Sequence, residues 1–320
     1  MTASEELVQV HDRHWIKVDS IDSLALRAQS GVFEPDEVDV CKKLIQPGDR
    51  VLDVGANIGF YTLLFADLVG ESGKVVAVEP DIGNYELLAE NLQRQVNSRV
   101  VELRRLALGR EPGKASLFRA IDNAGMHRMY PSVCCAGESL EVEVVTGDSL
   151  QLAPLNFIKI DIEGYEPIAF EGLQATLRSS PELKILCEFS PLSIFEAGAS
   201  PVAFLEQMAA HGFSAFGLGA GRWSEINLNA MISALSQISS NALQELAGAL
   251  QSSEGNQSIE QKASHFLATH GYKRPMLENL LFVSPKAHSF VTNRLSAAGN
   301  SPSSSFINRL AGFFRAKSAD

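Results

Sequence analysis

Short apolar runs alternate with stretches of helical periodicity along most of the chain. The runs with the length and composition of buried strands are residues 51–54, 75–78, 157–162, 183–189 and 213–218. Apolar positions recur at helical spacing in residues 82–96, 167–177 and 201–211. This alternation is typical of βαβ units, whose parallel strands are covered by helices on both faces. We therefore expect an α/β fold with a mostly parallel sheet.

Other patterns extend or interrupt this alternation. Weaker strand patterns occupy residues 99–106, 115–118 and 140–145, with a long loop between the last two. Asp81 is placed to cap the helix at residues 82–96, one face of which carries Ile82, Tyr85, Ala89, Leu92 and Val96. After residue 221 the pattern becomes helical at residues 226–250 and 259–270, and an apolar run at residues 280–283 indicates a strand that returns to the sheet.

The chain divides into three segments on these patterns. We expect an N-terminal cap segment at residues 1–46, a main domain at residues 47–288 with a helical insertion at residues 222–270, and a low-complexity linker with a short tail at residues 289–320. One helical face of the tail carries Ile307, Leu310, Ala311 and Phe314. We expect this tail to be frayed, with weak contact to a membrane surface or a partner as the alternative.

Composition and charge narrow the class of protein. Hydrophobic residues make up 45% and charged residues 20% of the 320 residues, as in an ordinary soluble domain. The formal net charge of -11 opposes binding to a phosphate backbone, so nucleic acid is not an expected partner. Because we find neither a membrane-spanning apolar run nor a signal-peptide pattern, we expect a cytoplasmic protein. The four cysteines lack CxxC spacing, which favours reduced thiols and no metal site.

A glycine-rich turn follows the strand at residues 51–54. It reads Asp53-Val-Gly55-Ala-Asn57-Ile-Gly59, and its glycines allow a tight turn and close approach of a ligand to the next helix. A carboxylate at Asp53 disfavours a phosphate but suits S-adenosylmethionine, which carries an amino group and a sulfonium. Glu79 ends the next strand, where a carboxylate can bind ribose hydroxyls. Alternatively, Asp53 only caps a helix or forms an ion pair, and Glu79 is only the last residue of a strand.

A second group of charges lies in the stretch NFIKIDIEGYE. Strand alternation places Lys159, Asp161 and Glu163 on one face, opposite three isoleucines. Ligands of open α/β sheets bind beyond the carboxyl ends of the strands, so Asp161 and Glu163 should reach the same cleft as the turn at Asp53. The alternative is a salt-bridged strand end without a role in binding.

Several motifs in order resemble the FkbM family of S-adenosylmethionine-dependent methyltransferases. They are PGDRVLDVGANIGFYT, VEP, LALG, TGDSL, IKIDIEGYEPIAFEGL, LCEFSP and NLLFV, and they cover residues 33–218 and 279–283. The resemblance implies a seven-stranded Rossmann-like sheet and O-methylation of hydroxyls on natural products and sugars. It assigns Asp53, Gly55, Asn57, Gly59 and Glu79 to the cofactor, and Lys159, Asp161, Glu163, Gly164 and Glu166 to the family's second motif. Gly147 departs from the leucine common in the family.

The expected reaction is transfer of a methyl group from S-adenosylmethionine to a hydroxyl of a small molecule or glycan. A weakly acidic hydroxyl needs a base, for which the candidates are Asp161, Glu163 and His127, the last in a polar loop that we expect to bend over the cleft. His127 can equally be a structural histidine. Two other functions stay open: a non-catalytic binding module with this fold, and an NAD-dependent oxidoreductase, against which Asp53 argues.

Overall fold

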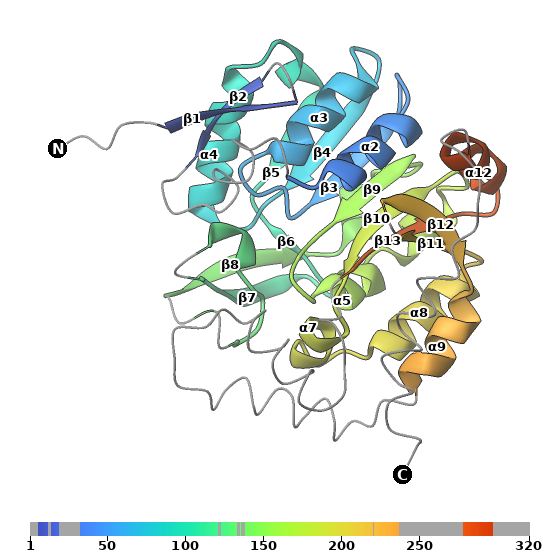
Figure 1. The fold of residues 1–320 in the computed structure, drawn as a ribbon. Coiled ribbons are helices and arrows are strands. Elements are labelled where there is room, and N and C mark those ends of the chain that lie inside the picture. Colours follow the sequence, from blue (N-terminus) through green and yellow to red (C-terminus); the bar gives the residue numbers. More distant parts are fainter. Residues whose placement is uncertain are drawn as a thin grey trace.

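Five parallel strands form the centre of the molecule (Figure 1). The computed structural model describes residues 6–11, 14–18, 33–120, 123–132, 135, 138–219, 221–236 and 278–296. The five strands, in their spatial order, are β5 (Val101–Arg104), β4 (Lys74–Val78), β3 (Arg50–Val54), β9 (Phe157–Ile160) and β10 (Lys184–Phe189). The chain moves outward from β3 to β5 and then returns to the other side of β3, so the strand order reverses between β3 and β9. Ligands of such sheets bind at this switch point.

Three further strands extend the sheet beyond β10. They are β13 (Glu278–Val283), β11 (Ser214–Gly219) and β12 (Arg222–Ile226). β13 is antiparallel to both β10 and β11, and β12 is antiparallel to β11 at the edge. The predicted Rossmann-like, mostly parallel sheet is therefore confirmed, with eight strands in the described residues rather than seven.

The extra strand lies where the sequence predicts the start of a helical insertion. In β12 only Trp223 and Ile226 are buried, and the Trp223 indole N–H donates to the Asp36 carbonyl at 3.3 Å. Pairing with β11 thus overrides the helical pattern. Helix α9 (Leu228–Ser236) follows as predicted, whereas residues 237–277 lie outside the described part.

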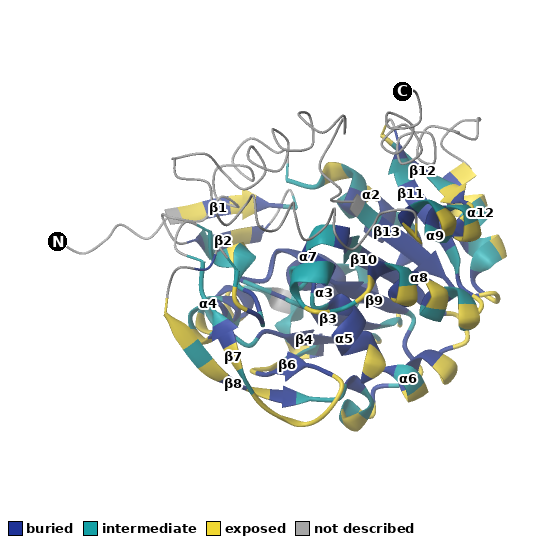
Figure 2. Cartoon of the chain, turned by 90° about the horizontal axis from the view of Figure 1, so that it is seen from below, coloured by how far each residue is buried: buried dark blue, intermediate teal, exposed yellow. Residues whose placement is uncertain are grey.

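Helices cover both faces of the sheet and create two cores. One face packs against α2 (Pro35–Leu44), α3 (Phe60–Val69), α4 (Ile82–Gln93) and α12 (His288–Ser296). The other packs against α5 (Glu166–Glu171), α6 (Gln174–Arg178), α7 (Pro191–Glu196), α8 (Pro201–Ala210) and α9. Strand residues alternate between the cores, with Val51 in the first and Leu52 in the second. Figure 2 shows these strands as buried between helices with exposed outer faces.

Smaller elements flank the sheet. A hairpin of β1 (Glu6–Val10) and β2 (His14–Val18) precedes α2, and a three-stranded sheet contains β6 (Ala107–Leu108), β8 (Ser139–Val145) and β7 (Gly113–Phe118). Short 3-10 helices lie at η1 (Val96–Val100), η2 (Ala124–Met126) and η3 (Gly147–Leu150). No helix of the described residues is long and apolar enough to cross a bilayer.

Three local predictions were wrong. The buried face of α4 contains Asn84, Leu88, Asn91 and Leu92, whereas Ile82 is 41% exposed. β9 ends at Ile160, before Asp161, and the chain then turns at Glu163 and Gly164, which have positive φ angles. The helix predicted at residues 167–177 is split at Gly172, where a Cβ atom would lie 2.1 Å from the Gly109 carbonyl oxygen.

At the ends of the chain the structure adds one helix. α12 occupies the first residues of the segment predicted as a linker and buries Val291 and Leu295. The predicted amphipathic face at Ile307, Leu310, Ala311 and Phe314 lies outside the described residues, as does Cys134. The described cysteines, Cys41, Cys135 and Cys187, are buried.

Asn91 is predicted to stabilise the first core through polar contacts. It is fully buried, its Nδ2 donates to the carbonyls of Lys17 and Ile58 at 3.1 and 2.9 Å, and its Oδ1 accepts from the Lys17 amide at 2.7 Å. Asn91→Ala leaves these backbone groups unpaired and should lower the free energy of unfolding by about 2 kcal/mol or more in urea titrations. The exposed Glu86→Ala on the same helix is the control, and an equal loss there would contradict this role.

Candidate active site

The turn after β3 adopts a backbone that ordinary residues rarely reach. Gly55, Asn57 and Gly59 have φ angles of 81°, 48° and 100°. A Cβ at Gly55 would lie 2.0 Å from the Asp161 carbonyl oxygen, and one at Gly59 would lie 2.5 Å from the Leu88 Cδ1. Glycine is therefore required at position 55 by the close approach of backbone as well as by φ, and favoured at position 59 by φ. The turn leads directly into the first residue of α3.

Glu79 holds this turn from the end of β4. One of its carboxylate oxygens accepts the Asn57 amide and the other accepts the Asp81 amide, each at 2.9 Å. Glu79 is 5% exposed, and burial raises its pKa to about 7 although both amides oppose the rise. The predicted ribose acid and the predicted glycine turn are thus joined by a hydrogen bond, and each oxygen retains a lone pair for a further donor.

Asp53 lies beneath the turn in the first core. It is 1% exposed, and its Oδ2 accepts the Thr62 hydroxyl at 2.6 Å. Its Oδ1 is fully buried and has no hydrogen-bond partner among the described residues. Burial raises the pKa of Asp53 to about 6, opposed by the ammonium of Lys159 and the Thr62 hydroxyl. A buried acceptor without a donor is costly and suits a site completed by a ligand.

The segment after β9 brings its acids to the same edge of the sheet. The Asp161 amide donates to the Val54 carbonyl at 3.1 Å, which fixes Asp161 beside the Asp53 strand. Glu163 has φ of 58° and Gly164 has φ of 98°. The fully buried Glu166 accepts the amides of Ile162 and Gly164 at 2.9 and 3.2 Å and so holds this second turn. The two predicted motifs therefore converge at the switch point, beyond the ends of β3 and β9.

Lys159 lies below Asp161 on β9. Its Nζ donates to Asp161 Oδ2 at 2.8 Å and lies 4.4 Å from the centroid of the Tyr61 ring. The Tyr61 hydroxyl in turn donates to Glu34 Oε2 at 2.5 Å. Glu34 precedes α2, so this chain of contacts extends from the N-terminal segment to the end of β9.

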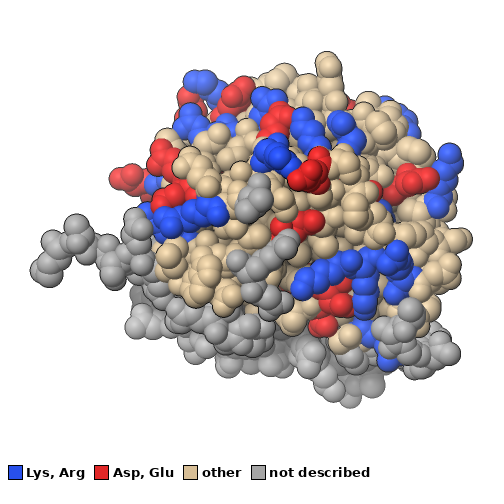
Figure 3. Space-filling model, turned by 90° about the horizontal axis from the view of Figure 1, so that it is seen from above, with Lys and Arg blue, Asp and Glu red and all other residues tan. Residues whose placement is uncertain are grey.

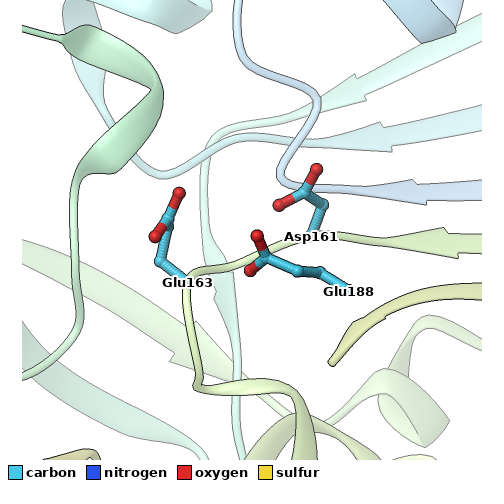
Figure 4. A group of neighbouring side chains, drawn as sticks. All are labelled: Asp161, Glu163 and Glu188. Carbon is cyan, nitrogen blue, oxygen red and sulfur yellow. The ribbon is translucent and has the colours of Figure 1, made fainter. Parts of the chain in front are cut away.

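Glu188, in the motif LCEFSP, adds a third carboxylate that is not among the predicted site residues. Oxygens of Asp161, Glu163 and Glu188 lie within 4.8 Å of one another, and Figure 4 shows the three side chains directed toward a common space. Burial, followed by the charges of Glu163 and Asp161, raises the pKa of Glu188 well above its usual range. The available signal was a single acid at the end of an apolar strand next to β9. Three oxygens at this spacing match what a divalent cation binds, although the sequence predicts no metal site.

The loop between β7 and β8 packs against Glu163. Arg128 is 5% exposed and donates to Glu163 Oε2 at 3.2 Å and to Glu196 Oε2 at 3.0 Å. The Tyr130 hydroxyl donates to the Glu163 carbonyl at 2.6 Å. Earlier in the loop, a Cβ at Gly125 would lie 3.3 Å from the Asn57 side-chain nitrogen. The loop therefore contacts both turns of the site.

His127 has a different set of neighbours from the other candidate bases. Its Nδ1 accepts the Ala120 amide at 3.1 Å, and its Nε2 lies 3.9 Å from Asp81 Oδ2. Burial lowers the pKa of His127, and Asp81 opposes this shift. Asp161 and Glu163 instead contact Lys159 and Arg128. The structure thus brings Asp161 and Glu163 together and places His127 beside the start of α4.

The chain is similar to known methyltransferases. A family model described as the methyltransferase FkbM domain matches residues 53–215. The chain is 45% identical over 60 residues to a protein-L-isoaspartate O-methyltransferase of Aeropyrum pernix, covering 18% of this chain and 22% of that protein. It is 32% identical over 116 residues to ribosomal RNA large subunit methyltransferase E of Hahella chejuensis, covering 32% of this chain and 54% of that protein. The chain thus spans about a fifth and about half of these two relatives.

Two solved structures align with parts of the chain. A methyltransferase FkbM from Methylobacillus flagellatus aligns over 55% of this chain and 42% of its own, with 17% identity and a TM-score of 0.36. An O-methyltransferase from Bacillus cereus, solved in complex with SAH, aligns over 65% of this chain and 89% of its own, with 20% identity and a TM-score of 0.39.

The burial of Asp53 predicts a pH-dependent stability. An unfolded aspartate ionises near pH 3.8, whereas the pKa of Asp53 is about 6 in the fold, so between these values the folded protein retains a proton that the unfolded chain has lost. The stability from this proton is lost as the pH rises through about 6. Asparagine does not titrate, so Asp53→Asn does not lose this stability. As the pH rises from about 5 to about 8, its free energy of unfolding should therefore increase by on the order of 1–2 kcal/mol relative to that of wild type. Urea titrations test this, and an equal gain for the exposed Asp39→Asn would argue against it.

Proposed function

The chain belongs to the FkbM family of S-adenosylmethionine-dependent methyltransferases, and we propose that it transfers a methyl group from that cofactor to a hydroxyl of a small molecule or a sugar. The observation that carries the proposal is the meeting of two acid-bearing turns at the switch point of the sheet, where the Asp161 amide donates to the Val54 carbonyl. One turn offers a cofactor site, and the other offers carboxylates for the acceptor.

The turn at residues 53–59 supports a cofactor without phosphate. We propose that Gly55, Asn57 and Gly59 line the cofactor, that Glu79 binds the ribose hydroxyls, and that Asp53 provides negative charge for the amino and sulfonium groups. A ribose-binding acid such as Glu79 follows the glycine turn in nicotinamide sites as well. Asp53, however, is 1% exposed, and this buried carboxylate would repel a pyrophosphate at the turn. This charge argues against the alternative of a nicotinamide cofactor.

The reaction requires alignment and removal of one proton. The acceptor oxygen attacks the methyl carbon in line with the carbon–sulfur bond, that bond breaks with its electrons going to sulfur, and the hydroxyl proton passes to a base. We propose Asp161 as that base, since it lies at the end of β9 beside the cofactor turn. Glu163 is the second candidate, held by Arg128. His127, beside Asp81, is the third.

We propose a small molecule or glycan, rather than a nucleic acid, as the acceptor. Two relatives are ribosomal RNA methyltransferases, but their similarity covers 32% and 15% of this chain. The net charge of -11 opposes a phosphate backbone. Among the described residues visible in Figure 3, blue Lys and Arg side chains are interrupted by red Asp and Glu side chains instead of forming a continuous basic surface. We also propose residues 47–288 as the catalytic domain.

Glu79→Gln tests the cofactor site. The amide keeps the size of the side chain but places an NH2 group against one backbone N–H and removes the charge that accepts two ribose hydroxyls. We expect S-adenosylmethionine affinity, measured by calorimetry, to fall by about tenfold to a hundredfold while the protein stays folded. Glu143→Gln on the exposed face of β8 is the matched control. Unchanged affinity in Glu79→Gln would contradict the assignment.

Asp161→Asn tests the transfer itself. Cell extract is incubated with the protein and S-adenosylmethionine, and mass spectrometry detects S-adenosylhomocysteine and any metabolite or glycan heavier by one methyl group. If Asp161 removes the proton, its loss should lower turnover by about a hundredfold or more and change cofactor affinity little. A similar fall in turnover and in cofactor affinity would instead indicate that Asp161 binds the cofactor. Absence of any methylated product with wild-type protein would favour a non-catalytic binding module.

A further inference from the structure

Lys159 occupies a position in the centre of the sheet where a charged side chain is costly. It lies on β9, between β3 and β10, and is 5% exposed. Its neighbours along the strand, Ile158 and Ile160, are fully buried. An apolar side chain of similar length would fill such a space without the loss of hydration that an ammonium group suffers. The burial of Lys159 therefore indicates that its charge is stabilised by specific partners.

Two carboxylates of the proposed site flank Lys159. Its Nζ donates to Asp161 Oδ2 at 2.8 Å. On the other side, Lys159 is paired in register with Asp53 of the parallel neighbour β3. Burial alone would lower the pKa of Lys159, but the charges of Asp161, Glu34 and Asp53 outweigh burial and raise it. The lysine is thus a permanent cation between the ends of two strands.

Every element packed around this lysine contributes titratable groups. They are Asp53 of β3, Glu34 before α2, Cys41 of α2, Tyr61 of α3, Asp161 after β9 and Glu188 of β10. Lys159 is the single cation in this set. Without it, several acids would lie close together with no cation among them, and some of them would take up protons.

We propose that Lys159 is a positioning residue, which aims Asp161 at the acceptor and balances the negative charge of Asp53 so that both carboxylates act on the bound cofactor and acceptor together. This inference rests on the proposed function. Asp53 already has a pKa near 6 with Lys159 opposing the effect of burial. Loss of the ammonium group should raise that pKa further and leave Asp53 protonated at neutral pH.

Lys159→Met tests the proposal through the pH dependence of cofactor affinity. Calorimetry with S-adenosylmethionine at about pH 7 and pH 9 gives the wild-type reference, in which Glu79, with a pKa of about 7, and the amino group of the cofactor titrate while Asp53 is already ionised above about pH 6. If loss of the ammonium group raises the pKa of Asp53 by about two units, only about one Asp53 in ten is ionised at pH 7, and the affinity of Lys159→Met relative to wild type should be about tenfold lower at pH 7 than at pH 9. Lys159→Arg keeps the charge and should keep the wild-type profile.

Lys184→Met is the matched control. Lys184 is also 5% exposed and lies on the adjacent β10, but its Nζ contacts the Leu44 carbonyl at 3.2 Å and Asp49 at 3.7 Å, at the beginning of the strand. The Lys184→Met substitution should therefore leave the pH profile of cofactor affinity unchanged. A loss of affinity in Lys159→Met that is the same at both pH values, or no loss at all, would overturn the inference.

A second measurement needs no cofactor. In protein labelled with 13C at the aspartate carboxyl carbons, the Asp53 signal, assigned with Asp53→Asn, should titrate about one pH unit or more higher in Lys159→Met than in wild type. An unchanged titration overturns the role of Lys159. Failure of wild type to bind S-adenosylmethionine would instead contradict the proposed function alone. Thermal melting reports whether the variants fold, and Lys159→Gln replaces Lys159→Met in both measurements if it does not.

Discussion

The arrangement of the site depends on the close approach of two backbone turns. The Asp161 carbonyl oxygen is so near Gly55 that a single added carbon atom would lie 2.0 Å from it. This contact joins the ends of β3 and β9, the two strands between which the strand order reverses. Asp53, Glu79 and Asp161 come from separate parts of the sequence, and they meet because parallel strands end at one edge of the sheet. A bulkier residue at Gly55 would separate them.

Much of the fold and part of the site followed from the sequence, for reasons of local chemistry. The buried parallel strands are continuous apolar runs, and glycine and aspartate mark the turns after them. The spacing from Gly59 to Glu79 matches one helix and one strand. The sequence therefore correctly predicted that the glycine turn and Glu79 lie at the same edge of the sheet. The hydrogen bond between Glu79 and the Asn57 amide follows from this geometry.

What the sequence did not reveal depends on contacts between distant segments. Asn91 is buried because Lys17 and Ile58 satisfy its amide, and no local pattern indicates those partners. Trp223 belongs to a strand because β11 offers a free edge, although the following residues have helical periodicity. Glu188 joins Asp161 and Glu163 only through the pairing of β10 with β9. A period of 3.6 or 2 residues cannot encode such neighbours.

The sheet includes strands that lie outside the residues matched by the family model. The FkbM match ends at residue 215, yet β13 at Glu278–Val283 inserts between β10 and β11. Glu34, which reaches the site through Tyr61, precedes the match. A protein trimmed to the matched residues would therefore lose β13, β12 and most of β11, and β10 would become an edge strand with unpaired backbone groups. Gene fusions and domain exchanges with relatives should use boundaries that include both segments.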